Sequence, residues 1–330
     1  MKAIIVRAPG GLDRIERVEL PDPGAPGPGA IRVRLHSSSL NFHDYGVVST
    51  PNRVSDGRIP MSDGAGLVES IGDGVTEFKV GDRVVSCFFP SWMEGPPPIA
   101  DFSTVPGDGV DGYARELVVA PATAFTHVPR GYSFTEAATL PTAGVTAWRA
   151  LVVNGALKAG DTVLLLGTGG VSIFALQIAK AMGATVIATS SSDEKLKRVH
   201  ALGADHTINY RHDPDWGARV REWTHGSGVD HVIEVGGPGT LAQSITAVAI
   251  GGHIAQACYV DYAARAATSF DDQLNSVPSI HMRCRMTAIL RATATLALRR
   301  LLRLATRIPQ DLSADHFAMR VSSTLAASYR

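Results

Sequence analysis

Residues 164–195 read LLLGTGGVSIFALQIAKAMGATVIATSSSDEK, and this stretch decides the fold class. The leucine run predicts a strand that is covered on both faces, as in a parallel sheet. The glycines after it open a segment with apolar residues at helical spacing, which ends at Gly183, a typical C-cap. A second apolar strand, ATVIATS, follows. Together these elements predict a dinucleotide-binding βαβ unit.

The chain downstream continues this alternation. HTINY, VDHVIEVG and HIAQACYV have strand character, and the helical patterns DWGARVREWTHG and TLAQSITAVAIGG lie between them. Ser191 and Glu194 form a predicted capping box for the helix SDEKLKRVHALG. Strands that alternate with helices over short connections predict a doubly wound parallel sheet of the α/β class.

The glycine turn is a candidate phosphate site. Glycine lets backbone N–H groups approach a pyrophosphate, and the helix N-terminus adds partial positive charge. The third glycine of the common fingerprint is replaced by Ser172, at a position that serves helix–strand packing. The alternative interpretation is a turn required only for packing. The predicted phosphate-binding residues are Gly167, Thr168, Gly169, Gly170 and Val171.

The tip of the second strand indicates which nucleotide binds. An NAD site carries Asp or Glu there, to accept from the ribose 2′-hydroxyl. This chain has Ser190 and Ser191, with Lys195 one turn later, and hydroxyls with a cation suit a 2′-phosphate. The sequence therefore predicts NADP(H). The alternative is that the serines only cap a helix and the lysine is solvated. Tyr210, after the third strand, either flanks the adenosine or packs.

The first 125 residues predict a β-rich region. AIRVRLHSSSLN alternates apolar and polar residues, and GAGLVESIGDGVTEFKVGDRVV places two strands around glycine turns. FFPSWMEGPPPIADFSTVPGDGVDGYAREL is rich in Pro and Gly, so we expect a long surface excursion there.

Composition excludes several partner classes. Lys+Arg and Asp+Glu both count 31, so no charge excess points to nucleic acid or to an anionic membrane. No apolar run approaches the ~20 residues of a membrane span, and MKAIIVRAPGG is too short for a signal-peptide core. The three cysteines, Cys87, Cys258 and Cys284, are too far apart to predict a disulfide framework or a metal pair. We expect a cytoplasmic protein.

Six motifs appear in an order that resembles the medium-chain dehydrogenase/reductase superfamily over about residues 1–260: SLNFHDY, GAGLVESIGDGVTEFKVGDRVV, EAATLPTAGVTAWRAL, LKAGDTVLLLGTGGVSIFALQIAKAMGA, VDHVIEVGG and GGHIAQ. The resemblance implies a GroES-like catalytic domain over 1–125 and a Rossmann NADP(H)-binding domain over 126–265, with a cofactor cleft between them. It also implies that HIAQACYV is an edge strand that pairs in a homodimer.

The resemblance locates the family's zinc positions as well. Zinc-dependent alcohol dehydrogenases carry Cys-x-x-Asp where this chain has Asn41–Asp44, and Gly-His-Glu where it has Met61–Asp63. The third ligand position, near TLPTAG, has neither Cys nor His. Catalytic zinc needs about three converging N or S ligands, and only His43 and Asp63 remain as candidates. We therefore expect no metal, and the resemblance is to the zinc-independent, quinone oxidoreductase-like branch.

A site without metal must act largely by positioning. Quinones and α,β-unsaturated carbonyls accept hydride readily, whereas a simple alcohol must also lose a proton, so reduction by NADPH is favoured. The resemblance implies that Asn41 orients the substrate oxygen or the nicotinamide, although a turn-fixing amide is the alternative. Tyr45 is the candidate proton donor, with His43 as the alternative acid, and Asp44 is expected to make a structural hydrogen bond.

The resemblance adds a further group of predicted cofactor-binding residues: Thr142, Gly144, Thr146, Val235, Gly236, Gly237, Ala257 and Cys258. Two alternative functions stay open. One is a zinc-free alcohol or ketone dehydrogenase. The other is a catalytically silent NADPH-binding protein, because fold alone does not fix function.

The segment 266–330 loses the resemblance. LRATATLALRRLLRLATRIP has a helical pattern, and QDLSADHFAMRVSSTLAASYR offers no closing strand of the kind with which this family returns to its catalytic domain. Three explanations compete: divergence, truncation and rebuilding, or a reading frame that changes near residue 270.

Overall fold

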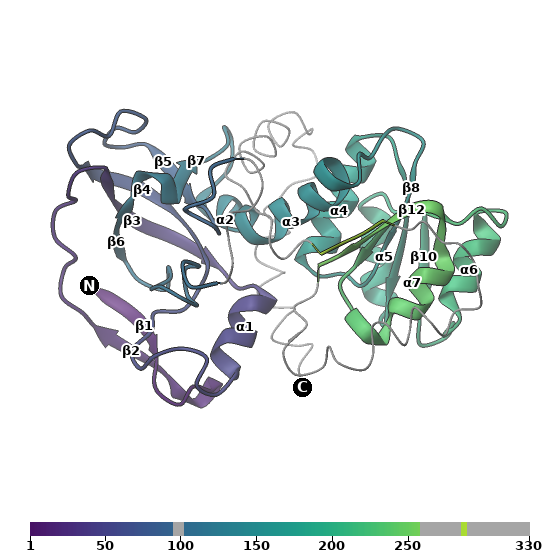
Figure 1. The fold of residues 1–330 in the computed structure, drawn as a ribbon, viewed down its shortest axis with the longest axis horizontal. Helices are drawn as coiled ribbons and strands as arrows, with labels where there is room; N and C mark the ends of the chain where they lie inside the picture. The colour runs from purple at the N-terminus through teal and green to yellow at the C-terminus, as the bar shows by residue number, and fades with distance from the viewer. Residues whose placement is uncertain (95–101, 258–284, 289–330) are drawn as a thin grey trace. The chain divides into compact units, whose positions relative to one another are not determined.

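The computed structural model describes residues 1–94, 102–257 and 285–288 (Figure 1). The described chain divides into two compact units between Val145 and Thr146. No helix in these ranges is long and apolar enough to cross a membrane. Cys258 and Cys284, and all of segment 266–330 apart from 285–288, lie outside the described residues.

Unit 1 is built on a five-stranded sheet with the order β6-β3-β4-β5-β7, next to a two-stranded sheet of β1 and β2. Its core is formed by Val33, Val84, Phe125 and their neighbours. The strands are β1 (Lys2–Val6), β2 (Ile15–Glu19), β3 (Ala30–Ser39), β4 (Asp63–Ile71), β5 (Arg83–Ser86), β6 (Leu117–Pro121) and β7 (Phe125–His127). The helices are α1 (Phe42–Ser49) and α2 (Phe134–Ala138), with short turns η1 (Leu12–Arg14) and η2 (Ala122–Ala124).

The end of β3 positions the candidate site of unit 1. β3 pairs with β4 in antiparallel register, so that Ser39 lies opposite Asp63. The chain then turns at Leu40 and Asn41 and enters α1 at Phe42. This geometry places the start of α1 beside the first residue of β4.

The prediction of a surface excursion after β5 is wrong for the part of that segment that the structure describes. Phe89, Trp92 and Val105 are at most 1% exposed. The rings of Phe88 and Phe89 meet edge to face with their centroids 4.9 Å apart. Burial of large aromatic side chains outweighs the tendency of Pro- and Gly-rich chain to lie on the surface. The irregular segment after β5 therefore contributes side chains to the hydrophobic core.

Unit 2 confirms the predicted α/β architecture. Its six strands are all parallel where paired and have the order β10-β9-β8-β11-β12-β13. They are β8 (Thr162–Leu165), β9 (Thr185–Ser190), β10 (His206–Asn209), β11 (Val229–Glu234), β12 (Val248–Gln256) and β13 (Arg285–Ala288). The flanking helices are α4 (Gly170–Ala181), α5 (Asp193–Ala201), α6 (Trp216–Trp223) and α7 (Leu241–Ala247). A short turn η5 (Gly237–Gly239) precedes α7.

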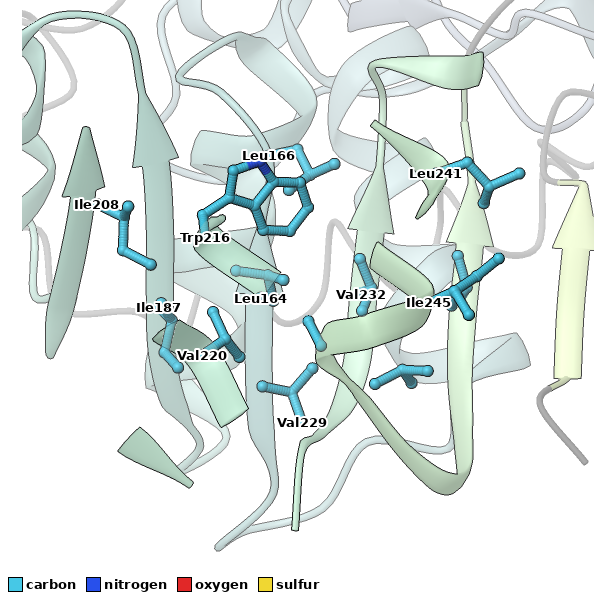
Figure 2. Packing of buried hydrophobic residues seen from close by; sticks show 13 residues of the cluster. Leu164, Leu166, Ile187, Ile208, Trp216, Val220, Val229, Val232, Leu241 and Ile245 are labelled. Carbon is cyan, nitrogen blue, oxygen red and sulfur yellow. The ribbon is translucent and has the colours of Figure 1, made fainter. Parts of the chain in front are cut away.

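One face of this sheet packs against α6 and α7, as Figure 2 shows. The strands contribute Leu164, Ile187 and Val232, and the helices contribute Trp216, Val220, Leu241 and Ile245. The continuous apolar strands seen in the sequence are thus covered as a parallel sheet requires.

Helical chain also runs from Leu140 to Asn154, across the division between the units. It begins and ends in π-helical turns, η3 (Leu140–Gly144) and η4 (Arg149–Asn154), on either side of α3 (Val145–Trp148). π turns inside helices often occur at functional sites, and the predicted residues Thr142 and Gly144 lie in the first of them.

Two local predictions are corrected. The N-cap of α5 is Ser192, not Ser191, and its hydroxyl oxygen accepts from the backbone N–H of Lys195 at 3.4 Å. The helix α7 ends at Ala247 and β12 begins at once, although the sequence predicts helix as far as Gly252. The apolar residues where α7 meets β12 fit the period of a helix and that of a strand equally well. The sequence pattern alone therefore does not show where the helix ends.

The segment HIAQACYV is not an edge strand, contrary to the prediction. β13 pairs in parallel with β12, with Gln256 opposite Ala288. This sixth strand follows the last of the sequence motifs on which the family resemblance rests, GGHIAQ. The homodimer stays a prediction, without the edge-strand argument that suggested it.

Candidate active site

Asn41 is the N-cap of α1 and the centre of a hydrogen-bond network in unit 1. Its backbone N–H donates to Asp44 Oδ2 at 2.7 Å. Its side-chain Nδ2 donates to Asp63 Oδ2 at 3.0 Å and to Asp44 Oδ2 at 3.2 Å. The amide of Asn41 therefore bridges two carboxyl groups, one on α1 and one at the start of β4.

Asp63 connects Asn41 to Thr142. The Thr142 hydroxyl donates to Asp63 Oδ1 at 2.7 Å, and the Ser39 hydroxyl donates to Oδ2 at 2.9 Å. Asp63 itself is fully buried. Two residues predicted for different roles, Asn41 and Thr142, are thus held by one carboxyl group. Sequence reasoning named Asp63 only as a leftover zinc ligand and missed this role.

Asp44 closes the network on its other side. Ser62 donates to Asp44 Oδ1 through its backbone N–H at 2.8 Å and through its hydroxyl as well. The expectation that Asp44 makes structural hydrogen bonds is confirmed. Met61, just before Ser62, has a left-handed φ of 78°. A non-glycine residue in that region stores about 1–3 kcal/mol of strain, which surrounding contacts must hold.

Burial governs the charges of this network. It raises the pKa of Asp63 to about 7, because a buried carboxylate loses its hydration, and the neighbouring Asp44 adds repulsion. Hydrogen bonds from Thr142, Asn41 and Ser39 act in the opposite direction. Burial raises the pKa of Asp44 as well, against the hydrogen bonds from Ser62 and Asn41. Near neutral pH, Asp63 is therefore partly protonated.

His43 is directed into an aromatic cluster. Its ring lies 5.3 Å from the ring of Phe88 and 5.5 Å from that of Phe102, measured between centroids. Its Nε2 is 3.7 Å from Asp108 Oδ2. Burial lowers the pKa of His43, against the attraction of Asp44 and Asp108. The imidazole is therefore mostly neutral at pH 7, which weakens its case as the acid.

Tyr45 lies on α1, one turn after Asn41. It is half-buried, and its ring centroid is 6.1 Å from that of Phe42, which is exposed. The predicted donor thus belongs to the same short helix as Asn41.

The glycine turn of unit 2 is open where a phosphate would approach. Gly167 has φ of 71°, a conformation that favours glycine, and Gly169 is the N-cap of α4 without a side-chain cap. A Cβ built on either glycine meets nothing within 4 Å. Ser172 is buried and its hydroxyl donates to the Leu166 carbonyl at 2.7 Å, so it fills the packing position of the third glycine. The turn fits a pyrophosphate.

The predicted 2′-phosphate residues gather at the tip of β9. Ser190 is buried, and its hydroxyl oxygen accepts from the Ser192 backbone N–H at 3.3 Å. Ser191 and Lys195 are half-buried beside it. Tyr210, 41% exposed, donates its backbone N–H to the Ser190 carbonyl at 3.1 Å. The closest acid in sequence, Asp193, accepts from Asn209 Nδ2 at 2.6 Å.

The remaining predicted cofactor residues lie at three places. Gly144 is buried and Thr146 is half-buried, in the helical segment that begins at Leu140. Val235, Gly236 and Gly237 directly follow β11, and Ala257 directly follows β12. Cys258 is not among the described residues.

Comparisons with known proteins agree with this arrangement. The alcohol dehydrogenase GroES-like domain family matches residues 27–130, and the zinc-binding dehydrogenase family matches residues 170–295. A zinc-type alcohol dehydrogenase-like protein from Schizosaccharomyces pombe is 44% identical over 258 residues, which cover 76% of this chain and 73% of that protein. The chain belongs to the medium-chain dehydrogenase/reductase superfamily.

Two further relatives are reductases or oxidoreductases by name. A 2-haloacrylate reductase from Burkholderia is 34% identical over 252 residues, which cover 74% of this chain and 68% of that protein. The crystal structure of a quinone oxidoreductase from Pseudomonas syringae superposes with a TM-score of 0.71 at 29% identity, over 95% of this chain and 89% of that one. This superfamily member is an NAD(P)H-dependent oxidoreductase of the zinc-independent, quinone oxidoreductase-like and alcohol dehydrogenase-like branch.

The donors at the superfamily's zinc positions do not fit zinc. Asn41 directs its amide N–H groups at carboxylates, and the Ser62 hydroxyl donates to Asp44, so neither supplies a nitrogen or sulfur ligand. Among the described residues, no three His, Cys, Asp or Glu side chains are grouped as a metal would require. Hydrogen bonds among Ser39, Asn41, Asp63 and Thr142 connect the residues of this site.

Proposed function

We propose that this enzyme transfers hydride from NADPH to a quinone or an α,β-unsaturated carbonyl compound, without a metal ion. The observation that carries the proposal is the network of Asn41, Asp63 and Thr142. It stands at the positions where zinc-dependent relatives hold a Lewis acid, and its hydrogen bonds fix the Asn41 amide and the Thr142 hydroxyl in place there.

The reduced nicotinamide, when bound, supplies the hydride. The protein orients the acceptor. Because Asn41 Nδ2 is held by Asp63 and Asp44, the plane of its amide is fixed before substrate arrives. The hydroxyl of Tyr45 donates the proton that the product oxygen needs. The substrate must itself be electrophilic, since no metal polarises it.

The preference for NADPH rests on the tip of β9. Ser190, Ser191 and Lys195 offer hydroxyls and one cation, and Asp193 is engaged with Asn209. A 2′-phosphate gains from the cation and meets no carboxylate at the strand tip itself. The names of the two relatives, a 2-haloacrylate reductase and a quinone oxidoreductase, support an electrophilic acceptor.

A matrix of donors and acceptors tests the proposal. NADPH and NADH are each offered with a small quinone, a conjugated enone and a saturated ketone, and oxidation is followed at the nicotinamide absorbance. We expect turnover with the quinone or the enone and a preference for NADPH. Equal rates with NADH and NADPH would contradict the assignment of NADPH as the cofactor. Activity only with the saturated ketone would contradict the proposed substrate class of quinones and conjugated carbonyl compounds.

Oxidation of a simple alcohol is the second candidate, and one observation favours it. Such an alcohol must lose a proton, which requires a base. Asp63, with its pKa raised to about 7 and its hydrogen bond to the Thr142 hydroxyl, is suited to take that proton. Reduction of NADP⁺ by a saturated secondary alcohol, lost in Asp63→Asn, would establish this function.

A further inference from the structure

Glu234 occupies a special place in the sheet of unit 2. It is the last residue of β11, and β11 lies between β8, which leads into the glycine turn, and β12. The chain order runs outward from β8 to β9 and β10, then returns to β11 on the other side. Ligands of doubly wound sheets bind at the carboxyl ends of the strands where this order reverses.

The side chain of Glu234 gathers four donors from the chain that follows it. Its Oε1 accepts from the backbone N–H groups of Gly236 at 2.7 Å and Gly237 at 2.9 Å, and from the Thr240 hydroxyl at 2.6 Å. Its Oε2 accepts from the Ser244 hydroxyl at 2.5 Å. The carboxylate therefore ties the turn after β11 to the first residues of α7.

The backbone of Glu234 holds the neighbouring strand as well. Its carbonyl oxygen accepts from the N–H of Ala257, which follows β12, at 2.8 Å. Thus one residue contacts both segments for which cofactor contacts are predicted on this side of the sheet, the Val235–Gly237 turn and Ala257.

The turn also packs closely against Thr240. A Cβ built on Gly236 would clash with the Thr240 hydroxyl oxygen, so this position has no room for a side chain unless Thr240 moves. Glu234 is fully buried. Burying a carboxylate costs free energy unless hydrogen-bond donors surround it. A buried carboxylate with several donors also fixes those donors in one arrangement.

We infer that Glu234 is a positioning residue for the dinucleotide: it shapes the turn after β11 and the end of β12 so that their backbone groups meet the bound cofactor. The inference rests on the proposed function, because it assumes that NADPH is the nucleotide. It assigns no chemical step to Glu234, which acts through the backbone of its neighbours.

Four variants separate positioning from mere support of the fold. Glu234→Leu removes every acceptor for the turn, and Thr240→Val removes one donor while keeping the shape of the side chain. Glu234→Gln is the conservative variant, because its carboxamide oxygen can accept from the turn and the Ser244 hydroxyl can accept from its nitrogen. Asp161→Asn is the matched control. Asp161 is another buried carboxylate of this unit, at the opposite, amino edge of the sheet, where it accepts from His231 at 3.0 Å.

The measurement is the Kd of the full-length chain for NADPH, from the change in nicotinamide fluorescence, together with the Tm without nucleotide. One lost hydrogen bond of about 0.5–1.5 kcal/mol raises the Kd about twofold to tenfold in Thr240→Val. We expect a larger rise in Glu234→Leu, a Kd close to wild type in Glu234→Gln, and a lowered Tm with an unchanged Kd in Asp161→Asn.

Two results would contradict the inference in different ways. The first is a wild-type chain that binds NADPH, together with Thr240→Val and Glu234→Leu variants that bind it with the same Kd. This result would overturn the inference about Glu234 but not the proposed function, whatever happens to the Tm. If Glu234→Leu does not fold, Thr240→Val decides. A wild-type chain that binds neither NADPH nor NADH would overturn the proposed function, and this inference with it.

Discussion

Replacement of Asp63 by Asn removes a buried carboxyl group of the network that titrates near neutral pH. The folded protein raises the pKa of Asp63 from 3.8 to about 7. That difference corresponds to about 4 kcal/mol of free energy between the two protonation states. The folded state holds the proton more tightly than the unfolded chain does. The contribution of Asp63 to stability is therefore complete below pH 4 and is lost as the pH rises through about 7.

Asn at this position resembles the protonated acid. Its carbonyl oxygen can accept from Ser39 and Asn41, and its amide can donate to the Thr142 hydroxyl. We therefore expect Asp63→Asn to match the wild type below about pH 4, and to be more stable by about 1.5 kcal/mol near pH 5 and by about 4 kcal/mol near pH 8. Asp44 adds a slope of the same sign, because burial raises its pKa too.

Urea unfolding at pH 5, 6.5 and 8 measures this effect, followed by far-UV circular dichroism and tryptophan fluorescence. Asp73→Asn is the matched control, because Asp73 is exposed in the same unit. It should leave the pH dependence unchanged. If wild type and Asp63→Asn lose stability equally between pH 5 and pH 8, Asp63 does not carry the buried proton and the reasoning fails.

Substitutions at three further residues test other parts of the account. Ser190→Asp places a carboxylate at the tip of β9, so the Kd for NADPH should rise at least about tenfold while that for NADH falls. Ser190→Ala removes only a hydroxyl, so it should weaken NADPH binding much less and leave NADH binding unchanged. An unaltered preference in Ser190→Asp would contradict the NADPH assignment. If the Tyr45 hydroxyl donates the proton, Tyr45→Phe should lower kcat for quinone reduction by about 10²-fold with little change in KM. Full activity of this variant would exclude that role. Trp92→Ala should lower the free energy of unfolding of unit 1, measured with denaturant, by about 3–5 kcal/mol, because Trp92 is fully buried. A loss below about 1 kcal/mol would mean that the segment around Trp92 lies on the surface.

The sheet of unit 2 is predictable from sequence because its signals are local. The apolar runs of β8, β9 and β11 and the glycines between β8 and α4 each fall within a few neighbouring residues. The parallel arrangement follows from their alternation with helices. β13 was not predicted, because Arg285–Ala288 is a short strand whose pairing with β12 depends on contacts far away in sequence.

The network of unit 1 could be predicted only in part, for the same reason. Asn41 and Asp44 are close in sequence, and a hydrogen bond within that turn was expected. Asp63 and Thr142 join them only because the end of β3 lies beside β4 and because η3 follows α2. The long loop after β5 shows the opposite failure. Its Pro and Gly content predicts irregular backbone correctly, but composition does not report that Trp92 fills the core.

The most direct test of the central claim is turnover by metal-free protein. The full-length chain is dialysed against a strong chelator, its zinc content is measured, and NADPH oxidation with a small quinone is followed before and after zinc is added back. The account predicts the same rate at every zinc content, because Asn41, Asp63 and Thr142 replace the metal. A rate that falls with the zinc and returns when zinc is restored would contradict it.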